Sequence, residues 1–364
     1  MSTAALQGRA QPACSPSRVA PGWGTRLRRG WCVALLWCAS GVLGLANAQG
    51  GASPPSYGPP QRGVEEWLER LQQGATIASY VGTYVVSSST GAMSSARIWH
   101  VCEGPQQYER VDTLSGQPRS TFRRNDQITT IVPHARLVRT EQRDPGGVFP
   151  NLLRLDSSDA TADHYRAREV GRGRVAGLEA DVVELQARDE LRFGYRIWSE
   201  RQTGLVLKMQ TLAATGEVLE QAAFSEVRLN LPLDAVKPQF QMPSTEGYRS
   251  EHFERERIDP AQGGWSVKGA VAGFQPLACY RRDVAGPGDV LQWLFSDGLA
   301  TVSLFIERFD PRRHNQAGVS AMGATHAMSR RWPDGSGAWW LTLVGEVPHA
   351  TLERLVELLV HEDK

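Results

Sequence analysis

Hydrophobic and polar residues alternate with a period of two over most of the chain between residues 78 and 229. In the first of these segments Tyr80 and Tyr84 share one face of a predicted strand, and Val81 and Val85 share the other. Such alternation is typical of β-strands with one buried face. Turn-forming pairs such as Thr203-Gly204 separate the segments. Further strands are predicted at 96–102, 108–113, 120–125, 127–132, 135–140, 180–187, 191–199, 205–212 and 217–229.

One helix precedes these strands. Val64, Trp67, Leu68 and Leu71 recur at helical spacing, and Gly74 follows as a stop. Many antiparallel strands at short spacing with a single helix indicate a strongly curved sheet or an open barrel, with the helix over its mouth or concave face. We therefore expect a first domain over 64–229.

An apolar loop tip flanked by Gly and Pro interrupts the pattern at 144–153. It reads either as a mobile flap or as a simple Ω-loop. The flap candidates are Phe149, Leu152 and Leu153.

A second module follows a proline-bearing segment, 230–250, which is predicted to be a linker. Alternation returns in residues 251–364, and Leu352, Leu355, Val356 and Leu359 predict a closing helix with Pro348 at its first turn. This part reads as a small α+β domain. Its strands are predicted at 265–267, 274–282, 290–296, 300–307, 323–331 and 338–344.

The first 48 residues have the form of a secretory signal peptide. They contain five Arg and no Asp or Glu, an apolar run from Trp31 to Ala46, and the small-residue pattern Ala46-Asn47-Ala48. The alternatives are a membrane anchor, for which the run is short, and a lipid-attached Cys38, which Trp37 disfavours. Residues 49–63, rich in Gly, Pro and Ser, are expected to form a flexible tether.

Removal of this leader changes the formal net charge from +1 to −4. That balance gives no reason to expect nucleic-acid binding. Cys102 and Cys279 are the cysteines that remain. An exported compartment favours a disulfide between them, and the alternative is two buried thiols that pack as small apolar groups.

Sequence signatures of catalysis are missing. The chain has no H-E-x-x-H, P-loop or G-x-S-x-G motif, and its eight His are scattered singly. Gly171-Arg-Gly-Arg-Val-Ala176 follows no buried parallel strand and opens no helix, so we read it as a turn. We expect no enzyme activity, no metal and no cofactor.

Aromatic and basic residues on the first domain suggest binding instead. The aromatic side chains could form either a packed core or the lining of a ligand cavity. The arginines between them could form a basic rim suited to an anionic amphiphile or an acidic peptide, or they could belong to a solvated face of mixed charge. The cavity candidates are Tyr80, Tyr84, Trp99, Phe122, Phe193, Tyr195, Trp198 and Phe224, and the rim candidates are Arg123, Arg124, Arg136 and Arg139.

Several of these segments resemble the RseB/MucB family of periplasmic negative regulators of the envelope-stress sigma factor, and the likeness covers nearly all of the chain after the leader. The segments include Tyr80-Val-Gly-Thr-Tyr84, Ser95-Ala-Arg-Ile-Trp-His100, Phe193-Gly-Tyr-Arg-Ile-Trp198, Gln221-Ala-Ala-Phe-Ser225 and Phe305-Ile-Glu-Arg308.

The resemblance implies an N-terminal, lipid-sensing domain shaped like LolA and LolB, an unclosed barrel with covering helices, and a C-terminal domain that binds an anti-sigma factor. It implies a periplasmic protein that binds the periplasmic part of a membrane-spanning, RseA/MucA-like partner and shields it from proteolysis. It also implies that lipopolysaccharide or a related lipid releases this partner. The alternative is a periplasmic lipid or lipoprotein carrier of the LolA/LolB type. The oligomeric state stays open, a homodimer included.

Overall fold

A computed structural model describes residues 62–75, 79–142, 158–282, 290–314, 316–332 and 339–362 of the chain. The predicted leader, the tether up to residue 61 and the flap candidates Phe149, Leu152 and Leu153 lie outside these residues. None of the helices in this part of the chain has the length and apolar character needed to cross a membrane.

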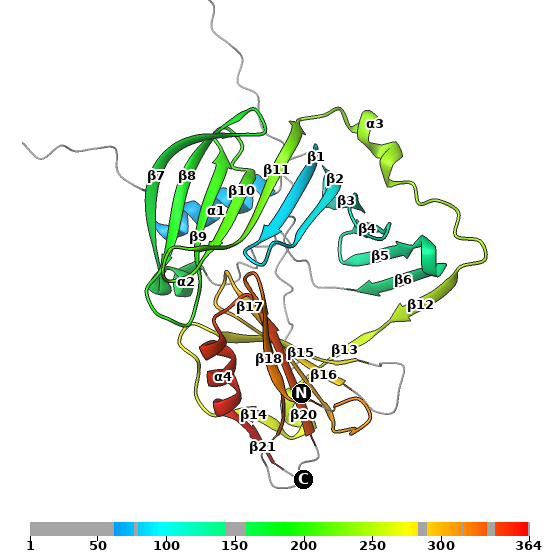
Figure 1. Ribbon diagram of the computed structural model, residues 1–364. Coiled ribbons are helices and arrows are strands. Elements are labelled where there is room, and N and C mark those ends of the chain that lie inside the picture. The colour runs from blue at the N-terminus through cyan, green and yellow to red at the C-terminus, as the bar shows by residue number, and fades with distance from the viewer. Residues whose placement is uncertain are drawn as a thin grey trace, which may run out of the picture. The chain divides into compact units, whose positions relative to one another are not determined.

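The first domain is built on a large sheet, as predicted, and this sheet has twelve strands, two more than the alternating pattern predicts (Figure 1). Its strand order is β12-β6-β5-β4-β3-β2-β1-β11-β10-β9-β8-β7, which begins and ends on different strands and so leaves the sheet unclosed. All neighbours are antiparallel except β12, which pairs in parallel with β6. The strands are β1 Ser79–Ser88, β2 Met93–Glu103, β3 Gln106–Thr113, β4 Ser120–Arg124, β5 Gln127–Val132, β6 Leu137–Gln142, β7 Tyr165–Val175, β8 Leu178–Ala187, β9 Gly194–Glu200, β10 Val206–Leu212, β11 Val218–Leu229 and β12 Arg249–Phe253.

The predicted helix is α1, Val64–Ala75, and it covers one face of the sheet. Trp67, Leu68 and Leu71 are fully buried and pack in one cluster with Ile197 and Val206 of the sheet. A second short helix, α2, spans Ser158–His164. Burial of an apolar helix face against strands is the main source of stability for such a short helix.

The segment predicted to be a linker packs on the opposite face of the sheet. It carries α3, Leu233–Val236, and the 3₁₀ helix η2, Lys237–Phe240. Val236 is buried against Val81 and Val101. This stretch is therefore part of the first domain's packing, and β12, which spans the boundary expected at residue 250, belongs to its sheet.

The second domain is the predicted α+β unit. Its seven-stranded sheet has the order β13-β15-β16-β17-β20-β19-β18, and β14 pairs with β21. Helix α4, His349–Leu358, buries Leu352, Leu355 and Val356 in the core of this domain. The strands are β13 Arg255–Ile258, β14 Trp265–Val267, β15 Gln275–Arg282, β16 Val290–Ser296, β17 Thr301–Arg308, β18 Gly318–Met322, β19 Thr325–Arg331, β20 Trp339–Gly345 and β21 Leu359–His361, and the short 3₁₀ helices are η1 Pro133–Ala135 and η3 Pro260–Gly263.

One turn prediction is wrong. The Gly-Arg-rich stretch from Gly171 to Val175 belongs to β7, and the turn follows at Ala176-Gly177, where φ is 48° and 83°. Two consecutive residues with positive φ form the tight turn that suits a two-residue hairpin. β7 is an edge strand with mostly exposed side chains, so it lacks the hydrophobic alternation that would have revealed it.

Candidate functional site: a pocket on the large sheet

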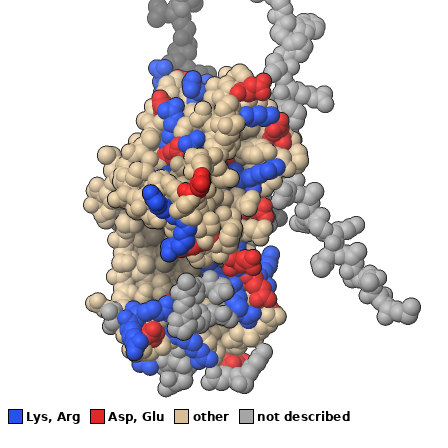
Figure 2. Space-filling view, turned by 90° about the vertical axis from the view of Figure 1, so that its right-hand side faces the viewer, with Lys and Arg blue, Asp and Glu red and all other residues tan. Residues whose placement is uncertain are grey.

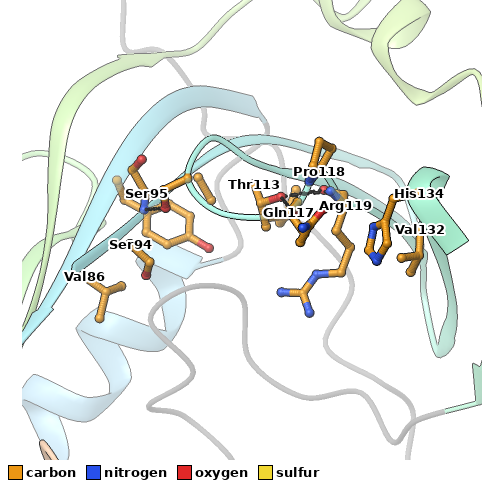
Figure 3. Close-up of a pocket in the computed structure, with 13 residues that line it drawn as sticks. Val86, Ser94, Ser95, Thr113, Gln117, Pro118, Arg119, Val132 and His134 are labelled. Carbon is orange, nitrogen blue, oxygen red and sulfur yellow. Dashed lines mark hydrogen bonds between the residues drawn. The ribbon is translucent and has the colours of Figure 1, made fainter. Parts of the chain in front are cut away.

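A pocket of about 530 Å³ opens on the first domain over β1, β2 and β3 (Figure 3). The strand register explains which residues face it, because directly opposed residues share a face. Tyr84 lies opposite Ala96, and Ala96 lies opposite Thr113. The lining residues are Tyr84, Val86, Ser94, Ser95, Ala96, Val111, Thr113, Ser115, Gln117, Pro118, Arg119, Val132 and His134.

Tyr84 joins this pocket to the core behind it. Its ring meets Phe224 edge-on, with 6.2 Å between the ring centroids, and Phe224 meets Tyr80 in the same way. Burial raises the pKa of the Tyr84 phenol, Glu109 raises it further and Arg119 opposes the change. The phenol is therefore a neutral hydrogen-bonding group at physiological pH.

Arg119 and His134 supply the basic character of the pocket. The side chains of both residues are drawn pointing into the same space, facing Ser94 and Val86 across it (Figure 3). The Arg119 backbone is held in place because its N–H donates to the Thr113 hydroxyl over 2.9 Å. The lining combines valine side chains with Ser, Thr and Gln side chains and the Arg119 guanidinium, so it suits a ligand that has both apolar parts and an anionic group.

Only Tyr84 of the eight predicted cavity residues lines this pocket. Tyr80 and Phe224 are buried in the core cluster beside it, and Trp198 packs at the edge of that cluster. Tyr195 is buried beneath α1, in the cluster that holds Trp67.

The other three candidates lie elsewhere. Trp99 and Phe122 are on the opposite face of the sheet, where the Arg110 guanidinium lies 5.1 Å from each ring centroid. Phe193 meets His326 of the second domain edge-on at 5.6 Å.

The predicted basic rim does not line the pocket either. Arg123 is buried and its Nε donates to the Asn125 carbonyl, while Arg124 lies over the Tyr108 ring. Arg136 is exposed at the end of η1, and Arg139 pairs with Glu251 at 3.2 Å. Basic and acidic side chains are interspersed over the face shown in Figure 2, so charge selectivity has to come from local groupings.

His134, Val86 and Ser94 are pocket residues that the sequence reasoning missed. Ser94 has the same parity along β2 as Ala96, which is the one signal that could have placed it on this face. His134 follows β5 in η1, where no periodic pattern applies.

The structure contradicts the Cys102–Cys279 disulfide, which is one of the two alternatives that the sequence leaves open. Cys279, on β15 of the second sheet, is a free and buried thiol, whereas Cys102 lies on β2 of the first sheet. Burial raises the pKa of the Cys279 thiol to about 11, so it behaves as a small apolar group. Within the described residues, no group of three or more His, Cys, Asp or Glu is placed to hold a metal ion.

Comparison with known proteins identifies relatives along almost the whole described chain. The family model for the MucB/RseB N-terminal domain matches residues 63–242, and that for the MucB/RseB C-terminal domain matches residues 259–360. The sigma factor AlgU regulatory protein MucB of Pseudomonas aeruginosa is 30% identical over 300 residues, covering 80% of this chain and 89% of the relative. The sigma-E factor regulatory protein RseB of Haemophilus influenzae is 22% identical over 302 residues, covering 81% and 90%.

Solved structures agree with these matches. MucB in complex with MucA(peri) is similar with a TM-score of 0.62 and 26% identity, over 83% of this chain and 100% of that chain. The MucA/MucB complex of Pseudomonas aeruginosa has a TM-score of 0.63 with 26% identity, over 83% and 99%. The two domain matches, in order and covering both sheets, show that this chain belongs to the MucB/RseB family of sigma factor regulatory proteins.

Proposed function

We propose that this chain is a non-enzymatic periplasmic regulator that binds the periplasmic part of a membrane-spanning anti-sigma factor of the RseA/MucA type. In this role it shields the bound segment from proteolysis and so restrains the envelope-stress response. The observation that carries the proposal is the similarity to MucB solved with MucA(peri), which extends over both domains of this chain.

We further propose that lipopolysaccharide or a related acylated ligand releases the partner by occupying the pocket at Tyr84. The support is chemical: Val86, Val111 and Val132 offer apolar contact, and Arg119 offers charge to a phosphate or carboxylate. A ligand can displace a partner only if it binds the partner-free form more tightly, and the coupling is then reciprocal. Bound anti-sigma segment should weaken lipid affinity by the same factor that lipid weakens segment affinity.

The direct test measures binding of the mature chain to the periplasmic segment of the cognate anti-sigma factor by calorimetry. Limited proteolysis of that segment, with and without the chain, then tests shielding. We expect saturable binding and slower cleavage. A segment that is cleaved equally fast in the presence of saturating chain would contradict the shielding role.

The alternative proposal is a periplasmic lipid or lipoprotein carrier, and the same pocket favours it. The two roles differ in what lipid does. A carrier delivers acylated ligand to acceptor vesicles without any anti-sigma segment present, whereas a regulator loses its segment when lipid is added. Transfer without release would decide for the carrier.

A further inference from the structure

A second pocket of about 410 Å³ lies on the opposite face of the large sheet, beneath α3 and η2. Its base is apolar, with Val81 of the sheet and Leu231 and Val236 of the covering segment, and two arginines, Arg97 and Arg228, complete its walls. We name it the outer pocket. Its lining residues are Val81, Arg97, Trp99, Arg228, Leu231, Ala235, Val236 and Gln239.

A β-bulge places Arg228 in this pocket. Thr83 lies opposite Glu226 while Tyr84 lies opposite Phe224, so Ser225 is an extra residue in β11. The extra residue moves the side chains that follow it in β11 to the opposite face of the sheet, because successive side chains of a strand alternate between faces. Without it Arg228 would share the face of Phe224; with it Arg228 lies opposite Val81, which in turn lies opposite Trp99.

The positive charge in this pocket is only partly neutralised. Arg228 is exposed, and its side chain forms no ion pair or hydrogen bond with any residue that the structure describes. Arg97 lies 3.7 Å from a Glu226 carboxylate that is 63% exposed and also accepts the Thr83 hydroxyl. The Arg97 Nε–H is buried without a hydrogen-bond partner among the described residues.

A third arginine, Arg110, lies beside the pocket and is neutralised, in contrast to Arg97 and Arg228. Arg110 donates to both carboxylate oxygens of Asp112, over 3.0 and 2.7 Å, and to the Gln239 carbonyl over 2.8 Å. It thereby fixes η2 as one wall of the pocket. Arg97 and Arg110 both lie over the Trp99 ring, at 5.4 and 5.1 Å from its centroid.

We propose that the outer pocket takes a carboxylate side chain from an acidic segment of a protein partner. The Arg228 and Arg97 forks match a carboxylate, and Trp and Arg are enriched among the residues that contribute most to binding at protein interfaces. The lining contains Arg97, Arg228 and Gln239 beside its apolar residues, and this polar character suits a carboxylate side chain better than an acyl chain. The identification of this partner as the anti-sigma segment rests on the proposed function. The acidic character of the ligand is inferred from Arg97 and Arg228 alone.

The test uses the full mature protein and two synthetic probes, acetyl-Leu-Glu-Glu-Leu-amide and its neutral counterpart acetyl-Leu-Gln-Gln-Leu-amide. The readout is the indole NMR signal of Trp99, assigned with a Trp99→Phe variant. We expect the acidic probe to shift this signal saturably and the neutral probe to bind at least about fivefold more weakly. Arg228→Gln should weaken the acidic probe by about fivefold to tenfold.

Arg166→Gln is the matched control, since Arg166 is an exposed arginine on β7 of the same sheet, and it should change nothing. Equal binding of both probes, or full binding by Arg228→Gln, would overturn the proposal. So would phosphatidylglycerol vesicles that move the Trp99 signal when the acidic probe does not, because they would assign the pocket to lipid.

A final measurement separates this inference from the proposed function. Arg228→Gln should also weaken the cognate anti-sigma segment by about tenfold. If the wild-type chain binds the acidic probe but not that segment, the outer pocket is supported and the proposed function is the part that fails.

Discussion

Arg192 and Asp297 form an ion pair with no solvent exposure on either side chain, with 2.8 Å between Nη1 and Oδ2. Arg192 precedes β9 of the large sheet, and Asp297 follows β16 of the seven-stranded sheet. Asp297 also accepts the Tyr165 hydroxyl over 3.1 Å, and Arg192 donates to the Ala272 carbonyl and to Asp189. Both charges are hydrogen-bonded, and the pair links a loop of the first domain to a loop of the second.

Replacing Asp297 with Asn should therefore destabilise the protein strongly. Arg192 would keep only the partly exposed Asp189 carboxylate as its counter-charge, and losing the hydrogen-bonded Asp297 charge should cost about 1.5–3 kcal/mol. The free energy of unfolding from urea titration measures the loss. Glu256→Gln, which breaks the exposed 3.0 Å pair with Arg281, is the control and should cost less than about 1 kcal/mol. Similar losses for both variants would contradict the assigned role of the buried pair.

Glu184 gives a stability contribution that depends on pH. Burial acts to raise its pKa, but hydrogen bonds from Arg168 and Arg196 prevail and lower the pKa of this carboxyl. Because the pKa of Glu184 is lower in the folded than in the unfolded protein, its ionised form stabilises the fold at pH values above the unfolded pKa of about 4.3. This contribution is lost as the pH falls through the pKa of the folded state. Glu184→Gln should cost about 1–2 kcal/mol at pH 7.

The difference between Glu184→Gln and the parent should shrink below about pH 4. Urea midpoints at several pH values measure it. Glu179→Gln, an exposed position on the same strand, should show little effect at any pH. A cost for Glu184→Gln that stays constant down to pH 3 would refute the ionic explanation.

The Cys279 thiol should be unreactive in the folded protein. It is 3% exposed and its pKa is raised to about 11, so both access and thiolate are scarce at pH 8. N-ethylmaleimide followed by peptide mapping should show little modification of Cys279 in native buffer and full modification in urea. Rapid native labelling, or a peptide linking Cys102 to Cys279, would contradict the assignment of Cys279 as a buried, free thiol.

Filling the Tyr84 pocket should block lipid and spare the partner. Ser94 is exposed on the pocket wall, so Ser94→Trp adds bulk without burying a polar group. We expect lipopolysaccharide to release the anti-sigma segment from this variant about tenfold less effectively, with lipid-free segment affinity unchanged. Ser250→Trp, exposed on β12, is the control, and equal release from both variants would remove this pocket from the mechanism.

The sequence was sufficient for the elements whose burial follows a simple period. Helix α1 was predictable because Trp67, Leu68 and Leu71 bury one helical face, and strands such as β2 and β9 alternate between buried and more exposed positions. Segments held by other forces were not predictable. The Pro-bearing stretch around Val236 resembles a linker until Val81 and Val101 provide a surface for it, and that surface is distant in sequence.

The site was less predictable than the fold. Alternation shows that Trp99 and Ala96 point to opposite faces of β2, but not which face carries the pocket at Tyr84. That depends on which strands neighbour one another and on where α1 and α3 pack. The bulge at Ser225 adds a second difficulty, since it reverses the faces of later β11 residues without leaving any periodic signal.

The passage of the chain from one sheet to the other is very short. β12 ends at Phe253 and β13 begins at Arg255, so Glu254 alone separates a strand of the large sheet from a strand of the small one. One residue contributes two soft backbone dihedrals, which makes this connection a joint and not a tether. A two-residue slip of β12 along β6 would move the start of β13 by roughly 6.6 Å. A shift of β12 along β6 would therefore displace β13, the first strand of the second domain, because the single connecting residue is too short to compensate for it.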